Sequence, residues 1–129
     1  MPDLDPPAVA CAALLSFLIG GVYYGLLGAR LAALTDATRE LPPWQLAAVE
    51  LVRGLVLSTV VAGLVGGLEL TTWYAGALLG LALWIGFPAV LWSGAMVHER
   101  TPWRLAALHA GDWLVKLPAV AGLLGAWPW

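Results

Sequence analysis

Two long stretches of this chain contain no charged side chain, and they restrict its fold more than any other feature. The first runs from Ala8 to Ala29 and the second from Leu70 to Val97. At a rise of about 1.5 Å per residue, a helix over either stretch is about 33 Å long or longer, and the hydrocarbon core of a bilayer is about 30 Å thick. Each stretch is therefore predicted to be a helix that crosses a membrane.

We expect two further spans, and with them a single transmembrane domain over residues 1–129. Both of these segments are apolar except for a few titratable side chains. Four spans with short connections predict an all-α fold, namely an integral membrane four-helix up-and-down bundle. Pro88 is expected to kink the third span, because proline has no backbone N–H to donate within a helix. The expected spans cover residues 8–29, 45–68, 71–97 and 105–127.

The composition of the whole chain excludes several other classes of protein. Hydrophobic residues make up 61% of the 129 residues and charged residues 11%, whereas a soluble domain has roughly 25% charged residues. Six basic residues against eight acidic ones, with no basic cluster, exclude a nucleic-acid partner. The lipid bilayer is therefore the first partner that we expect.

The basic residues of the connections fall on one side of the predicted bundle. The first and third connections contain arginines, whereas the N-terminus, the turn at Glu69 and the C-terminal tail contain no lysine or arginine. Because basic residues concentrate in cytoplasmic loops, both termini are predicted to face away from the cytoplasm. The arginines concerned are Arg30, Arg39, Arg100 and Arg104.

Tryptophans are expected to mark the two membrane boundaries. Trp44 and Trp103 fall at the predicted cytoplasmic boundary, and Trp73 and Trp127 fall at the opposite one. Indole rings are enriched at such interfaces, so these four residues are predicted to be interfacial anchors. The tryptophans deeper in the spans are expected to be packing residues; they are Trp84, Trp92 and Trp113.

Glycines recur at spacings that let helices approach each other closely. Gly21 and Gly25 are four residues apart in the first span, and Gly76 and Gly80 are four apart in the third. Such small-residue faces favour helix packing, either within the bundle or between copies of the chain. In the second case we expect a homo-oligomer or a larger membrane complex.

Charged residues inside a span are costly, and five titratable residues of the second and fourth spans are candidates for a functional or structural network. His109, Asp112 and Lys116 share one helix face, and Asp112 and Lys116 have the spacing of a favourable ion pair within the helix. Glu50 and Arg53 are neighbours in the second span at a matching depth. We expect Arg53 to pair with Asp112, and Glu50 with His109 or Lys116, in a network reached from the cytoplasmic side.

Several stretches resemble a bacterial membrane family, domain-of-unknown-function family 1761. The first is Gly21-Val22-Tyr23-Tyr24-Gly25-Leu26-Leu27-Gly28-Ala29-Arg30 at the end of the first span. The resemblance implies a small four-span protein of the bacterial inner membrane, and it implies no activity. The other stretches are Gly76 to Gly80, Trp84 to Phe87, Glu99 to Leu105, and Ala110-Gly111.

Two functions from different classes follow from these patterns. A structural or accessory subunit of a membrane assembly, or a homo-oligomer, would use the five titratable residues as buried polar contacts. The alternative is a small proton- or ion-coupled transporter or channel in which Asp112 and His109 titrate. No catalytic residue set, metal site or cofactor is expected, because no nucleophile, phosphate loop or sufficient ligand set occurs at a suitable spacing.

Overall fold

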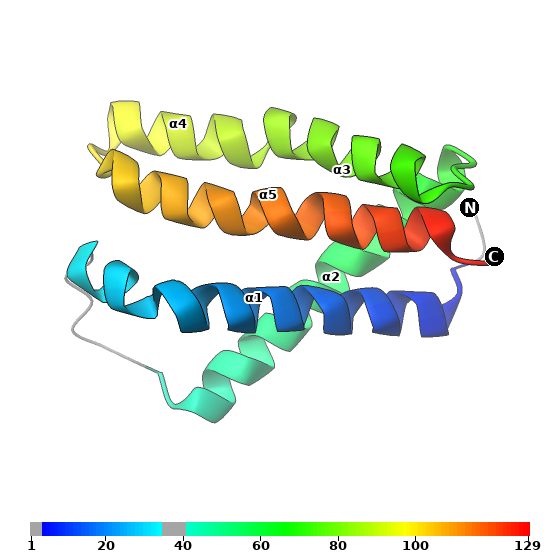
Figure 1. The fold of residues 1–129 in the computed structure, drawn as a ribbon, viewed down its shortest axis with the longest axis horizontal. Coiled ribbons are helices and arrows are strands. Elements are labelled where there is room, and N and C mark those ends of the chain that lie inside the picture. The colour runs from blue at the N-terminus through cyan, green and yellow to red at the C-terminus, as the bar shows by residue number, and fades with distance from the viewer. Residues whose placement is uncertain (1–3, 35–40) are drawn as a thin grey trace.

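The computed structural model describes residues 4–34 and 41–129, and all regular structure within these ranges is α-helical. The predicted all-α helical bundle is therefore confirmed (Figure 1). Because α3 and α4 form one long helix with an interruption, the helices make four passes along the length of the bundle. The helices are α1 (Pro6–Leu34), α2 (Pro43–Gly67), α3 (Trp73–Gly86), α4 (Pro88–His98) and α5 (Trp103–Ala126).

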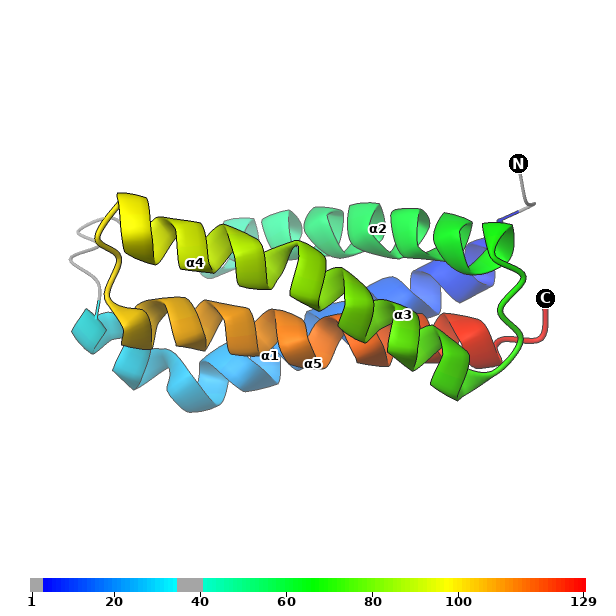
Figure 2. The same cartoon turned by 90° about the horizontal axis from the view of Figure 1, so that it is seen from above.

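The third pass bends where the sequence predicts a kink. α3 ends at Gly86, Phe87 has φ −119° and ψ −76°, and α4 begins at Pro88. Phe87 still donates its backbone N–H to Leu83, but Pro88 has no N–H to continue the ladder of hydrogen bonds. The change of direction between α3 and α4 is visible in Figure 2.

The first helix is longer than predicted. The first span is predicted to end at residue 29, but α1 continues through Arg30 to Leu34. Nothing in this region of the sequence stops a helix, because Leu31, Ala32 and Ala33 are all compatible with one. Arg39, which also contributes to the predicted orientation, lies outside the described residues.

The bundle has two distinct ends, which we name by their residues. Arg30, Arg100 and Arg104 lie where α1 and α4 end and α5 begins, and we call this the arginine end. At the opposite end, here called the terminal end, the indole N–H of Trp127 donates to the Asp5 carboxylate over 2.7 Å. The C-terminus and the start of α1 therefore lie together, as Figure 1 shows.

The central helix of the bundle is α5, which contacts all four other helices. Gly76 and Gly80 of α3 lie directly against the backbone of α5: a Cβ atom at Gly76 would overlap the carbonyl of Ala121, and one at Gly80 the carbonyl of Leu117. A side chain at either glycine would separate the two helices. The close approach of α3 to α5 thus depends on these two glycines.

The other two predicted packing glycines lie differently. A Cβ atom at Gly21 or Gly25 would meet no atom within 4 Å. The close approach of α1 to α2 instead uses Gly54, where a Cβ would lie 3.2 Å from the carbonyl oxygen of Ala13. The reason is geometric: α2 crosses α1 obliquely, so that the two helices are closest around one point rather than along a whole stripe (Figure 1).

The apolar core fills the half of the bundle near the terminal end. It is made of alanines and valines with two leucines, and the many small side chains let the helices pack closely. Leu124, Val61, Val65 and Val120 are the largest apolar side chains that are fully buried. Three segments of the described chain are long and apolar enough to cross a membrane, which indicates a multi-pass membrane protein; they are Pro6–Gly28, Pro43–Gly67 and Trp73–His98.

The tryptophans predicted as anchors lie at helix ends. Trp44, Trp73 and Trp103 are within the first two residues of α2, α3 and α5, and each is more than 60% exposed. Trp127 directly follows α5 and is held by Asp5. These positions place indole rings at both ends of the bundle, where an interfacial role requires them.

Candidate functional site

A partly open cavity of about 590 Å³ lies in the half of the bundle near the arginine end. It is bordered by α1, α2 and α5, with one residue from α4, and its lining includes aromatic as well as charged side chains. All five titratable residues singled out from the sequence line it. The lining residues from α1 and α4 are Phe17, Gly20, Gly21, Tyr24 and Trp92; those from α2 and α5 are Leu46, Ala47, Glu50, Arg53, His109, Asp112, Trp113 and Lys116.

The ion pairs differ from those predicted between the second and fourth spans. Arg53 pairs with Glu50 over 2.6 Å within α2, and Lys116 pairs with Asp112 over 2.8 Å within α5. These are the two ion pairs among the residues that the structure describes. The predicted pairings of Arg53 with Asp112, and of Glu50 with His109 or Lys116, are wrong, because each charge meets a partner on its own helix first.

The two pairs also differ in exposure. The side chains of Asp112 and Lys116 are 3% and 5% exposed, whereas those of Glu50 and Arg53 are 38% and 54% exposed. Burial of a charged pair is tolerated only when each charge is compensated, and here the i,i+4 spacing provides that compensation. The Glu50 and Arg53 pair is therefore an exposed wall of the cavity, and the Asp112 and Lys116 pair is its buried polar part.

Gly20 of α1 makes room for the buried pair. A Cβ atom at this position would lie 3.0 Å from Lys116 Nζ and 3.2 Å from Lys116 Cε. The lysine side chain therefore lies directly against the backbone of α1. Oδ2 of Asp112 forms the ion pair with the lysine ammonium. The other oxygen, Oδ1, is buried and has no hydrogen-bond partner among the described residues.

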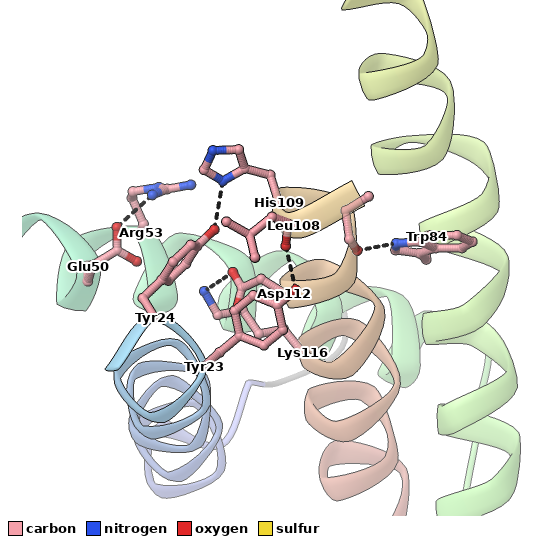
Figure 3. Close-up of polar contacts among 10 residues, drawn as sticks. Tyr23, Tyr24, Glu50, Arg53, Trp84, Leu108, His109, Asp112 and Lys116 are labelled. Carbon is pink, nitrogen blue, oxygen red and sulfur yellow. Dashed lines mark hydrogen bonds and ion pairs between the residues drawn. The ribbon is translucent and has the colours of Figure 1, made fainter. Parts of the chain in front are cut away.

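Two tyrosines of α1 belong to the site, although only their family resemblance draws attention to them in the sequence. Tyr23 donates its hydroxyl to the carbonyl of Leu108 over 2.5 Å, and the hydroxyl of Tyr24 is 2.8 Å from Nδ1 of His109 (Figure 3). A tyrosine hydroxyl inside a membrane span needs such a partner. This requirement is the signal by which the two tyrosines could have been assigned to the site.

Aromatic side chains of the cavity contact three of its titratable groups. The His109 ring stacks on Trp92 at a centroid distance of 4.8 Å and an angle of 14°. Trp113 lies near two cations, with the Arg53 guanidinium 5.9 Å and the Lys116 ammonium 5.3 Å from its ring centroid. Trp92 and Trp113, predicted to be packing residues, are thus cavity residues as well.

The stretches that carry the family resemblance meet beside this cavity. Tyr23, in the first stretch, lies against Gly111 in the last, where a Cβ atom would come 2.5 Å from the tyrosine hydroxyl. Trp84 of α3 donates its indole N–H to the carbonyl of Ala110 over 2.8 Å. Residues from the first and third passes are therefore joined to one short section of α5, the fourth pass, as Figure 3 shows.

The chemistry that this arrangement allows is binding and proton exchange. The cavity supplies carboxylates, cations, a histidine and aromatic faces, but the structure shows no group of three metal-ligating side chains among the residues it describes. Toward the terminal end the cavity gives way to the packed apolar core, so it is open in one half of the bundle. Such a cavity is suited to hold a small polar or amphipathic molecule.

The fold and the site together indicate a small multi-pass helical membrane protein with a cavity that charged and aromatic side chains line. A family model described as "Protein of unknown function (DUF1761)" matches residues 7–125. The chain therefore belongs to the DUF1761 family, and the predicted resemblance is confirmed. No curated protein and no solved structure matches the chain.

Proposed function

We propose that this protein is a small carrier of the bacterial inner membrane, and not an enzyme, and that its cavity holds the transported solute or ion. The observation that carries the proposal is the cavity itself, because it gathers Glu50, Arg53, His109, Asp112 and Lys116 in one half of the bundle. A titratable group inside a span is costly, and it is most often retained for transport or pairing.

The shape of the cavity favours a carrier over an open channel. The polar lining stops at the level of Lys116, and the next turns of α5 are buried in the apolar core with Val120 and Leu124 fully covered. A channel would need a polar path through this region. A carrier needs a site that opens to one side at a time, and the described arrangement corresponds to one such state.

Asp112 and His109 are the groups that we propose to exchange protons during transport. Histidine is the side chain that titrates near neutral pH, and His109 is half-buried at the cavity wall beside Tyr24. Asp112 is paired with Lys116, so a proton that binds the carboxylate would release the lysine from its partner. Such a change of pairing is a means of coupling a proton to a conformational change.

The proposed orientation places the cavity mouth on the cytoplasmic side. The arginine end of the bundle carries Arg30, Arg100 and Arg104, and the cavity lies in the same half. The positive-inside rule assigns this end to the cytoplasm and both termini to the other side. The protein is then expected to have four membrane spans, with α5 shielded by its neighbours at its charged positions.

A flux measurement tests the carrier. The protein is reconstituted into liposomes that contain a pH-sensitive dye, and proton entry is followed after a membrane potential is imposed. We expect faster proton entry than in protein-free liposomes, and loss of this excess in the double variant Asp112→Asn, Lys116→Gln. Glu69→Gln at the terminal end is the matched control. Equal rates with and without the wild-type protein would contradict the proposal.

A second candidate function is a structural or accessory subunit, and a specific observation favours it. None of the residues of α4 is fully buried, and Leu91 and Val97 are 70% and 74% exposed. Gly25 on α1 also has open space around it. These surfaces fit lipid, a second copy or another subunit. Native mass spectrometry from lipid particles separates the cases, since a homo-oligomer or a bound subunit would favour this second function and a monomer would contradict it.

A further inference from the structure

Some polar groups of the cavity have an ion-pair or hydrogen-bond partner and one has none, and this difference indicates what the cavity binds. Lys116 is paired with Oδ2 of Asp112, and Arg53 is paired with Glu50 and lies over the Trp113 ring. By contrast, Oδ1 of Asp112 is buried without a partner among the described residues. A buried carboxylate oxygen without a donor is costly, so a ligand that brings a donor to it would be favoured.

The cavity that Asp112 lines has aromatic walls. Phe17 and Tyr24 of α1, Trp92 of α4 and Trp113 of α5 all line the same cavity as Asp112. Aromatic faces attract organic cations, and they also cover the apolar body of a ligand. The two features together, a buried carboxylate oxygen without a hydrogen-bond partner and aromatic walls, are the elements of a site for an organic ammonium compound.

An inorganic cation fits the cavity less well. A metal ion such as Ca²⁺ is usually bound by about six to eight oxygen ligands, each about 2.3–2.6 Å from the ion. No group of three metal-ligating side chains is present in the described part of the chain. The cavity volume of about 590 Å³ is also far larger than a bare ion needs, and it is of the size that holds a small organic molecule.

We propose that the cavity binds a small primary ammonium compound with an apolar or aromatic body, with its ammonium group donating to Oδ1 of Asp112. Glu50 adds a second carboxylate at the wall, and Trp92 and Trp113 cover the body of the ligand. This inference rests on the proposed function, because it names the class of solute that the carrier would take. It concerns binding alone, so it is tested separately from flux.

The test is a comparison of three ligands of matched shape. Binding of phenethylammonium, 2-phenylethanol and 3-phenylpropanoate to the protein in lipid nanodiscs is measured by isothermal titration calorimetry, with empty nanodiscs as the reference. We expect phenethylammonium to bind at least about tenfold more tightly than either other compound, as the loss of a charge-assisted hydrogen bond implies. Equal or tighter binding of the carboxylate would overturn the proposal, as would the absence of saturable binding of phenethylammonium.

Variants locate the ligand in the cavity. The double variant Asp112→Asn, Lys116→Gln removes the carboxylate without leaving an unpaired ammonium. It is expected to lower the affinity for phenethylammonium at least about tenfold. Trp92→Leu, which removes an aromatic wall, is expected to lower this affinity as well. This variant keeps the test valid if the double variant does not fold. Glu69→Gln at the terminal end should bind as the wild type does. Unchanged affinity in Trp92→Leu or in a folded double variant would overturn the proposal.

The outcomes also separate this proposal from the carrier. Proton flux that depends on Asp112 and Lys116, without binding of phenethylammonium, would leave the carrier in place and exclude this ligand class. Binding of phenethylammonium that depends on Asp112 and Trp92, without proton flux, would establish the site and exclude the proton-coupled carrier.

Discussion

Asp112 and Lys116 form an ion pair one turn apart on α5, with 2.8 Å between the lysine Nζ and the carboxylate Oδ2 and both side chains at most 5% exposed. The pair lies where the open polar half of the bundle meets the packed apolar half. A buried pair of this kind is costly to break on one side only, because the remaining charge stays buried without a partner. This relationship gives the first prediction.

Removal of one member of the pair is expected to destabilise the protein more than removal of both charges. Asp112→Ala leaves the Lys116 ammonium uncompensated, and we expect the free energy of unfolding to fall by about 3–5 kcal/mol. The double variant Asp112→Asn, Lys116→Gln should lose less, since the neutral side chains can still hydrogen-bond. Denaturant unfolding in detergent, followed by tryptophan fluorescence, measures both. A double variant that is as unstable as Asp112→Ala would contradict this prediction.

The contact between α3 and α5 gives the second prediction. Gly76→Ala places a methyl group onto the carbonyl of Ala121, and we expect a loss of about 1–3 kcal/mol or more in the free energy of unfolding. Gly25→Ala is the matched control, because a Cβ there meets no atom and alanine favours a helix by about 1 kcal/mol over glycine. The same unfolding measurement should therefore show opposite signs for the two variants. A neutral Gly76→Ala would show that the close packing is absent.

The hydrogen bond between Asp5 and Trp127 gives the third prediction. It joins the start of α1 to the residue after α5, and its donor and acceptor are 2.7 Å apart. Trp127→Phe and Asp5→Ala should each lower the free energy of unfolding by about 1–3 kcal/mol, as expected of a partly buried bond to a charged group. In a double-mutant cycle the two losses should not add. Additive losses would mean that the two side chains do not interact.

The orientation in the membrane gives the fourth prediction. With the arginine end in the cytoplasm, a reporter fused after Trp129 lies outside the cytoplasm. Alkaline phosphatase, which is active only outside the cytoplasm, should be active in this fusion, and green fluorescent protein should be dark. Fusions that end at Arg100 should give the reverse pattern. A fluorescent C-terminal fusion would exclude the proposed orientation.

The sequence predicts the helices well because membrane spans are determined by local composition. The four expected segments correspond to α1, α2, the α3 and α4 pair, and α5, and the break falls at Phe87 beside Pro88 as expected. The helix α1 continues past the predicted end of the first span, since a charged residue such as Arg30 can lie in a helix beyond the membrane boundary. Charge alone is therefore a poor signal for where such a helix ends.

The site was predicted only in part because its geometry depends on how helices cross. The sequence identifies the five titratable residues that line the cavity, but it does not show that α2 crosses α1 obliquely near Gly54. In the structure Arg53 and Asp112 each pair with a residue of their own helix. Equal depth in the membrane was the basis for the predicted pairing, and depth says nothing about the rotation of a helix or its distance from another.

The central claim is that a polar cavity opens at the cytoplasmic side of this protein, and cysteine labelling tests it most directly. The exposed Cys11 is first replaced by alanine, and a cysteine is then introduced at Ala47 in the cavity or at the fully buried Ala62 in the apolar core. A membrane-impermeant thiol reagent is added to inverted membrane vesicles or to intact spheroplasts. We predict that Ala47→Cys is labelled in inverted vesicles and not in spheroplasts, and that Ala62→Cys is labelled in neither. Labelling of Ala47→Cys from the outside, or equal labelling of both positions, would contradict the account.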